Sequence, residues 1–210
     1  MKILVCVKVI NGELNPFDES ALECALRLSS DVTVISMGPK SCEDVLKPLT
    51  RLGAKGILIS DTVFAGSDTL ATSYVLGSAI RNMEYDLILC GRQSVDGDTA
   101  QVGPMLATML DIPVITNALS IEENNGFVTA KTRLGEELTK LPALVTVERG
   151  YVLRFPSIFS KLGEVRVIDN TEIGCDTEKC GLKGSPTRVL ETFERLVGDA
   201  RPRKLCSGKR

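Results

Sequence analysis

A polar loop between two apolar segments carries the side chains in this chain that are best suited to binding a ligand. The loop spans residues 91–101 and contains Arg92, Asp96, Gly97 and Asp98. Carboxylates accept hydrogen bonds from ribose hydroxyls or an adenine amino group, and a glycine lets a ligand approach the backbone. Two carboxylates would repel a phosphate, so we expect Arg92 to offset their charge. The loop is therefore a candidate nucleotide site.

The helix expected after the loop offers a second contact for a phosphate. We expect Asp98 or Thr99 to cap this helix, so that its free N–H groups and its dipole face the loop. Taken alone, Gly-Asp-Thr favours the alternative of an ordinary capped turn between a strand and a helix. The spacing matches neither the phosphate loop that ends in Gly-Lys-Ser/Thr nor the dinucleotide fingerprint with three glycines.

The composition excludes several kinds of chemistry. The chain contains no histidine, which removes every Ser-His or Cys-His nucleophile, so we expect no catalytic side chain. Seven scattered cysteines, an odd number, favour reduced thiols over a disulfide framework. Cys175 and Cys180 lack a second ligand pair, so no metal site is expected.

The charge and hydropathy patterns limit the expected partners. A net charge of −2 attracts no nucleic acid, and the basic residues 201–210 are expected to be a solvated end. No apolar run is long enough to span a membrane, so no stable membrane insertion is expected. The chain starts with a strand-like segment that lacks a cleavage region, and the expected location is cytoplasmic.

Apolar runs alternate with segments of helical period in the first half of the chain. Apolar runs in which polar residues do not occupy every second position are typical of strands that are covered on both faces of a parallel sheet. Such alternation predicts right-handed βαβ units and a mainly parallel sheet in a three-layer α/β/α fold, with ligands outside the carboxyl ends of the strands. The expected strands are residues 2–9, 32–37, 56–60 and 87–90, and the expected helices begin near Asn15, Ser41, Asp68 and Thr99. We expect Asn15 to cap the first helix, and Gly91 to let the backbone turn away at the end of the last strand.

The pattern changes after residue 110. Four strand-like runs at 113–119, 127–132, 134–139 and 143–148, with a turn at Asn124 to Gly126, predict antiparallel additions to the sheet. Beyond residue 150 the pattern weakens, and a helix is expected only at 187–197. We therefore predict an α/β nucleotide-binding domain over 1–150, followed by an extended segment over 151–210 that wraps a partner.

Two segments carry a specific resemblance to a known family. Residues 86–104, DLILCGRQSVDGDTAQVGP, closely resemble the signature of the electron transfer flavoprotein beta subunit, and residues 15–27, NPFDESALECALR, match a second motif of that family. Weaker likeness extends from Met1 to about Thr187. The resemblance implies an adenine-nucleotide-binding α/β fold like that of universal stress proteins.

The resemblance also implies particular contact residues. The nucleotide contacts of the family fall on Cys6, Asn15, Pro16, Phe17, Asp18, Met37, Gly91, Arg92, Gln93, Ser94, Val95, Asp96, Gly97, Asp98, Thr99, Ala100, Gln101 and Val102. The segment that docks onto partner dehydrogenases falls on Arg154, Phe155 and Ile158. Simple packing explains Cys6 and Met37 equally well, and a buried strand end explains the docking residues almost as well.

The function implied is electron transfer by bound cofactors. The resemblance implies a heterodimer with an alpha subunit that binds FAD, and a beta site that holds AMP or a second FAD that takes hydride from NADH. Residues 181–187 resemble tails of bifurcating members, which favours the second FAD. The alternatives are a universal-stress-type nucleotide sensor, which would be a homodimer without flavin, and an adenylating enzyme of the same superfamily.

The sequence departs from the family in two places. Only four residues separate Ile10 from Asn15, where family members usually carry a much longer loop, and this loss is expected to expose one side of the nucleotide pocket. The lysine-rich run that usually follows the position of Ile158 is missing, which leaves partner docking open.

Overall fold

The computed structural model describes residues 1–187, and its centre is a seven-stranded sheet in the order β12-β5-β4-β1-β6-β11-β7. Every neighbouring pair in this sheet is parallel. The strands are β1 (Lys2–Val7), β4 (Asp31–Met37), β5 (Lys55–Ile59), β6 (Leu87–Gly91), β7 (Val114–Ala118), β11 (Ala143–Val147) and β12 (Val165–Ile168).

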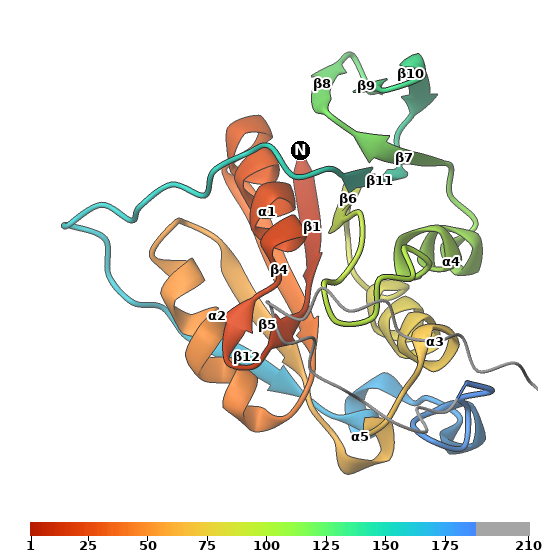
Figure 1. The fold of residues 1–210 in the computed structure, drawn as a ribbon. Helices are drawn as coiled ribbons and strands as arrows, with labels where there is room; N and C mark the ends of the chain where they lie inside the picture. The colour runs from red at the N-terminus through yellow and green to blue at the C-terminus, as the bar shows by residue number, and fades with distance from the viewer. Residues whose placement is uncertain (188–210) are drawn as a thin grey trace, which may run out of the picture.

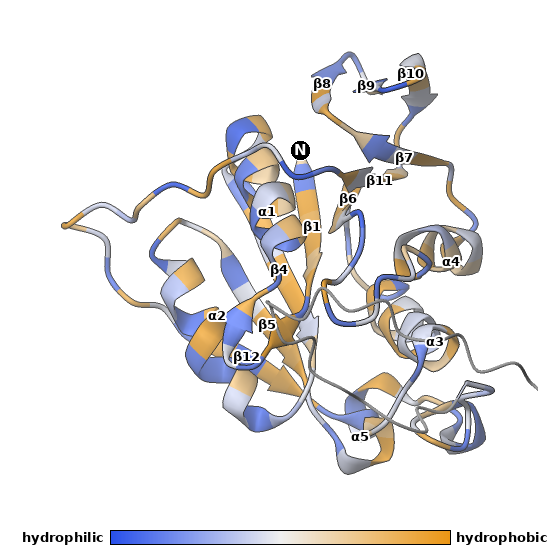
Figure 2. Cartoon of the chain, viewed as in Figure 1, coloured by the Kyte–Doolittle hydropathy of each residue, from blue (hydrophilic) through white to orange (hydrophobic). Residues whose placement is uncertain are grey.

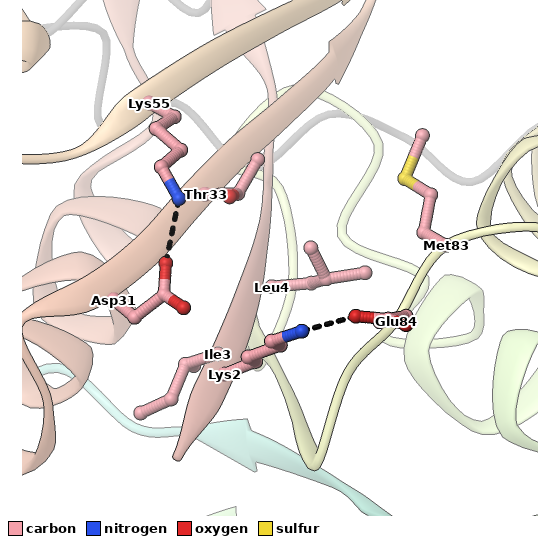
Figure 3. A pocket seen from close by; sticks show the side chains of 8 residues that line it. All are labelled: Lys2, Ile3, Leu4, Asp31, Thr33, Lys55, Met83 and Glu84. Carbon is pink, nitrogen blue, oxygen red and sulfur yellow. Dashed lines mark hydrogen bonds and ion pairs between the residues drawn. The ribbon is translucent and has the colours of Figure 1, made fainter.

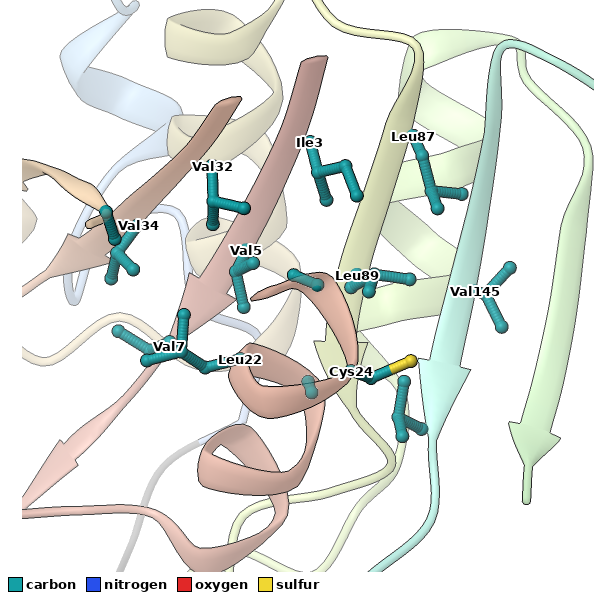
Figure 4. Packing of buried hydrophobic residues seen from close by; sticks show 14 of the residues in the cluster. Ile3, Val5, Val7, Leu22, Cys24, Val32, Val34, Leu87, Leu89 and Val145 are labelled. Carbon is teal, nitrogen blue, oxygen red and sulfur yellow. The ribbon is translucent and has the colours of Figure 1, made fainter. Parts of the chain in front are cut away.

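Helices cover both faces of this sheet (Figure 1). They are α1 (Pro16–Leu28), α2 (Glu43–Thr50), α3 (Thr69–Ile80), α4 (Val102–Leu110) and the short α5 (Asn170–Ile173), with 3₁₀ turns η1 (Lys40–Cys42), η2 (Thr62–Phe64) and η3 (Thr177–Lys179). Ile3, Val5 and Leu89 point toward Leu22 of α1 on one face (Figure 4). Leu4 and Ile88 pack with residues of α3 and α4 on the other face. The expected three-layer α/β/α fold is confirmed.

The hydropathy pattern explains this layering. The central strands are largely apolar, whereas helices such as α1 and α2 carry hydrophilic and hydrophobic residues side by side (Figure 2). A strand that packs against helices on both faces buries every side chain, as β6 does up to Cys90. None of the helices described is both long and apolar enough to cross a membrane.

The second half of the chain divides between two sheets. β7 and β11 join the central sheet in parallel, so the expectation that this half adds only antiparallel strands was wrong for them. The strands β8 (Ser120–Asn124), β9 (Phe127–Thr132) and β10 (Gly135–Lys140) instead form a separate antiparallel sheet. The turn predicted at residues 124–126 is present, with positive φ at Asn125 and Gly126. It joins β9 to β8, which was not predicted, and not to the run at 113–119.

A small hairpin follows β1, which ends at Val7 rather than at Val9. It consists of β2 (Val9–Ile10) and β3 (Glu13–Leu14), joined by Asn11 and Gly12 with φ of 51° and 81°. Two residues of positive φ make the tight turn that matches the twist of a hairpin. The short connection expected between β1 and α1 is therefore a hairpin with a tight turn.

The chain after β11 is extended but returns to the sheet. Residues 148–164 run past α1 to a tip away from the sheet, and β12 then pairs with β5 (Figure 1). The sequence analysis expected no strand here, and β12 corrects that expectation. The helix expected at 187–197 lies almost entirely outside the described residues. The wrapping of a partner by the extended parts stays a prediction.

The strand order places a switch point beside β1. From β1 the chain proceeds to β4 and β5 on one side, then crosses to β6 and β11 on the other. In open sheets of this kind the crevice for a ligand lies where the order reverses, outside the carboxyl ends of the strands. That point is the end of β1 and β6, where Lys8 and Gly91 stand.

Candidate nucleotide site at the ends of β1 and β6

A buried carboxylate from α1 joins the ends of the two strands at the switch point. Asp18 accepts hydrogen bonds from the backbone N–H of Lys8 at 2.7 Å and from that of Gly91 at 3.0 Å. Burial raises the pKa of Asp18 to about 7, although its hydrogen bonds act in the opposite direction. Asp18 therefore ties the carboxyl ends of β1 and β6 together.

Gly91 is required by the close approach of α1. A Cβ on Gly91 would lie 2.3 Å from Oδ1 of Asp18 and 2.7 Å from the carbonyl carbon of Phe17. The sequence analysis explained this glycine by a turn in the backbone, but its φ is not in the positive region. Absence of a side chain, rather than backbone freedom, lets α1 dock against the end of β6.

Asn15 fixes the loop after β6. The residue precedes α1 as expected, but its side chain makes no capping hydrogen bond. Its Nδ2 donates to the carbonyl oxygen of Gln93 at 2.9 Å, and its Oδ1 accepts from the N–H of Val95 at 3.2 Å. The interpretation of Asn15 as a helix cap was therefore wrong, because both ends of its amide bind the loop.

The loop continues further than the sequence predicted. Helix α4 begins at Val102 after Gln101, so neither Asp98 nor Thr99 caps it. Asp98 and Ala100 instead adopt φ of 52° and 54°, a region that aspartate tolerates better than most residues. Asp98 accepts a hydrogen bond from Nε2 of Gln93, which closes the loop on itself. Residues 95–99 of the loop are exposed to solvent.

The charges of the loop are paired differently from the expectation. Arg92 does not offset Asp96 and Asp98, because its Nη1 donates to Glu148 at the end of β11, 2.9 Å away. Lys8 binds Asp96 instead, with Nζ 2.8 and 2.6 Å from the two carboxylate oxygens. Burial acts to raise the pKa of Asp96, but its hydrogen bonds, chiefly the one from Lys8, have the larger effect. The pKa of Asp96 therefore lies below its ordinary value.

Lys8 and Glu148 are the site residues that sequence reasoning missed. Both directly follow apolar strands, Lys8 after β1 and Glu148 after β11. A charged residue at the carboxyl end of a buried strand was the available signal, since such ends converge at one edge of a parallel sheet.

Cys6 and Met37 lie beneath the crevice. Cys6 is buried and stands opposite Cys90 in the pairing of β1 with β6, and Met37 is half-buried at the end of β4. A hydrogen bond with Cys6, together with burial, raises the pKa of the Cys90 thiol well above its ordinary value. All cysteines in residues 1–187 are free and buried, and no group of acids or thiols there could hold a metal ion.

The structure thus gathers most of the expected contact residues at one edge. Residues 15–18 and 91–102 meet at the ends of β1 and β6, with Cys6 below them and Met37 one strand away. Asn15, Phe17 and Asp18 are buried, so their side chains position the loop. Gly97 is open, because a Cβ there would meet only Oγ of Ser94 at 3.4 Å.

The expected docking residues differ in their contacts and in their exposure. Nε and Nη2 of Arg154 bind Glu23 of α1 at 2.9 and 3.0 Å, and Arg27 binds the same carboxylate at 2.8 Å. Phe155 and Ile158 are instead 95% and 85% exposed, so they do not form a buried strand end. Arg154 therefore anchors the segment that presents these two apolar side chains.

Two further hollows lie away from the crevice. One, of about 300 Å³, is at the opposite end of the sheet, between the ion pairs Lys55–Asp31 and Lys2–Glu84 (Figure 3). The other, of about 670 Å³, lies between the start of α1 and residues 149–155. Neither is lined by the loop 91–101.

Known proteins resemble this chain over most of its length. The model of the electron transfer flavoprotein domain matches residues 3–172. The electron transfer flavoprotein subunit beta of Thermoanaerobacterium thermosaccharolyticum is 40% identical over 195 residues, which cover 85% of this chain and 75% of that protein. Protein FixA of Azotobacter vinelandii is 42% identical, covering 86% of this chain and 72% of its own length.

A third relative is longer than this chain within the aligned region. The electron transfer flavoprotein subunit beta of Megasphaera elsdenii is 37% identical over 235 aligned positions, covering 92% of this chain and 87% of that protein. This alignment is longer than the 210 residues of the chain, so the relative carries insertions. The chain therefore belongs to the electron transfer flavoprotein beta subunit family.

Proposed function

We propose that this chain holds the adenosine end of AMP or of a second FAD at the ends of β1 and β6. Paired with an alpha subunit that binds FAD, it passes electrons between a dehydrogenase or NADH and an acceptor. The observation that carries the proposal is the fixation of the loop at Gly91 by Asp18 and at Gln93 and Val95 by Asn15. A fixed loop at a switch point is a preorganised ligand site.

The residues of the loop fit an adenylate. Asp96 and Asp98 offer acceptors to ribose hydroxyls, and Gly97 leaves open space beside the backbone. The first N–H groups of α4, at Val102 and Gly103, have no partner within the helix and suit an anion. Gly103 also lets α4 lie close to β11, since a Cβ there would be 2.6 Å from Thr146.

The redox chemistry belongs to the bound flavin. A flavin accepts hydride or single electrons when it is held in the site. The chain binds and orients it, while its own thiols stay protonated because burial raises the pKa of Cys24 to about 11 and also raises that of Cys90. No side chain of the protein forms a covalent intermediate in this proposal.

Two surfaces are assigned to partners. We assign Phe155 and Ile158 to a partner dehydrogenase, because Arg154 presents these exposed apolar side chains from a fixed anchor. The alpha subunit is assigned to the extended parts of residues 150–186.

The tail at residues 181–187 favours a second FAD over AMP, because it resembles the tails of bifurcating members. Two relatives are named as subunits of reductase systems: acryloyl-CoA reductase electron transfer subunit gamma and caffeyl-CoA reductase-Etf complex subunit CarD.

Co-purification with the alpha subunit tests the proposal. The absorption spectrum and the nucleotides released on denaturation should show flavin, with either AMP or a second FAD for each heterodimer. The universal-stress-type sensor predicts instead a homodimer that carries an adenine nucleotide and no flavin. That result would replace the proposed function.

A further inference from the structure

The backbone of Lys8 is held in place directly after the end of β1. Its backbone N–H donates to Oδ2 of Asp18 at 2.7 Å, and its carbonyl oxygen accepts from the N–H of Asn15 at 2.9 Å. Both contacts come from the start of α1, directly after the central strand. The origin of the Lys8 side chain is therefore set by the same residues that fix the loop.

The ammonium group of Lys8 reaches across to the loop. Its Nζ lies 2.8 and 2.6 Å from the two carboxylate oxygens of Asp96, and the two side chains are 48% and 43% exposed. An ion pair that water reaches contributes little to stability, so a stronger anion can replace one of its members. Asp96 therefore occupies a position that another anion can take.

Two arginines nearby are already engaged elsewhere. Arg92 binds Glu148, whose side chain is only 9% exposed, and Arg149 lies over the ring of Phe17 with 5.7 Å to its centroid. Moving Arg92 would leave this buried carboxylate with only the more distant Arg133, whose Nη2 lies 3.9 Å away, which is costly. Lys8 is thus the cation of this edge that a ligand can recruit at least cost.

We propose that Lys8 recognises the 5′-phosphate of the bound adenylate, and that Asp96 holds the Lys8 ammonium in place until the phosphate arrives. This inference rests on the proposed function and names a residue outside the contact set that the family resemblance implies. A phosphate carries more charge than a carboxylate and offers more acceptor oxygens, so it displaces Asp96. The freed carboxylate then accepts from the ribose hydroxyls. Lys8 thereby selects nucleotides over nucleosides.

Calorimetric titration of the full chain with AMP and with adenosine tests this role. Lys8→Met should lower the AMP affinity by about tenfold or more, the scale of one charged hydrogen bond, and leave the adenosine affinity unchanged. Lys8→Arg should retain most of the preference for AMP. The control Lys55→Met removes an exposed ion pair at the opposite end of the sheet and should change neither affinity.

A second variant tests the proposal even if Lys8→Met does not fold. Asp96→Asn removes the competing charge but keeps an acceptor, so the ratio of AMP to adenosine affinity should rise. An unchanged or lower ratio contradicts the proposal. Two results for Lys8→Met also contradict it. One is an equal loss of affinity for AMP and for adenosine, which would make Lys8 a purely structural residue, and the other is an unchanged affinity for AMP. A wild-type chain that binds neither ligand would contradict the proposed function and this inference with it.

Discussion

Oδ1 of Asp18 accepts a hydrogen bond from the backbone N–H of Gly91 at 3.0 Å, which ties the first turn of α1 to the end of β6. The two residues are 73 positions apart in the chain. The other carboxylate oxygen binds the end of β1, so one side chain spans the switch point of the sheet. The predictions below follow from this arrangement and from the contacts around it.

The buried Asp18 should make stability depend on pH between about 4 and 7. Its pKa is raised from 3.8 to about 7, so the folded chain holds a proton that the unfolded chain has lost. The free energy of unfolding should therefore fall as pH rises through this window, by up to about 1.4 kcal/mol per pH unit.

The variant Asp18→Asn isolates this contribution. Urea unfolding of both proteins at several pH values should show the slope in the wild type and a smaller slope in the variant. Equal slopes from pH 4 to 7 would mean that Asp18 does not hold the proton.

Asn15→Ala should loosen the loop rather than the helix. The change removes the hydrogen bonds to Gln93 and Val95 and should cost about 1–3 kcal/mol of stability. Hydrogen exchange should speed up over residues 93–98 and change little at the start of α1. The matched control is Asp68→Ala, whose side chain does cap α3, and which should loosen the first turn of that helix. Faster exchange at residues 16–19 alone would restore the capping interpretation of Asn15.

The sheet could be predicted from the sequence because its strands are buried on both faces. The apolar runs of β1 and β6 have this property, and the helices between the strands show a helical period. β12 was missed because it has only four residues and exposes its two central ones. Local pattern gives no signal for so short an edge strand.

The contacts within the site depend on long-range packing and could not be predicted. Asn15 looks like a cap in its own segment, yet its amide binds residues 78 and 80 positions away. Arg92 looks like a partner for Asp96, yet it binds Glu148, 56 positions away. The start of α4 was misplaced because Asp98 and Ala100 adopt positive φ, which only the tertiary structure imposes.

Glu23 should give the fold part of its resistance to acid. Burial raises its pKa, but hydrogen bonds from Arg154 and Arg27 outweigh burial and lower the pKa to about 2. A lowered pKa stabilises the folded chain above about 4.5, and this contribution is lost as pH falls toward 2. Acid unfolding of Glu23→Gln should lack this loss, whereas the exposed control Glu172→Gln should behave like the wild type. Identical acid unfolding of wild type and Glu23→Gln would contradict the assignment.

Cys90→Ala should cost little and leave electron transfer intact. The thiol is buried, and its raised pKa keeps it protonated, so the change should cost on the order of 1 kcal/mol. Turnover should be unchanged in the complex with the alpha subunit. Loss of turnover with flavin still bound at full occupancy would show that the thiol takes part in the reaction.

The central claim is that an adenine nucleotide binds at the ends of β1 and β6, and calorimetry with AMP tests it most directly. The variant Asp96→Ala, Gly97→Val removes an acceptor and fills the open space in the loop. The matched variant Asp31→Ala, Lys55→Ala removes the ion pair of the hollow at the other end of the sheet. We predict that AMP affinity falls at least about tenfold in the first variant and stays at the wild-type value in the second. Unchanged affinity in the first variant, or a loss confined to the second, would contradict the site.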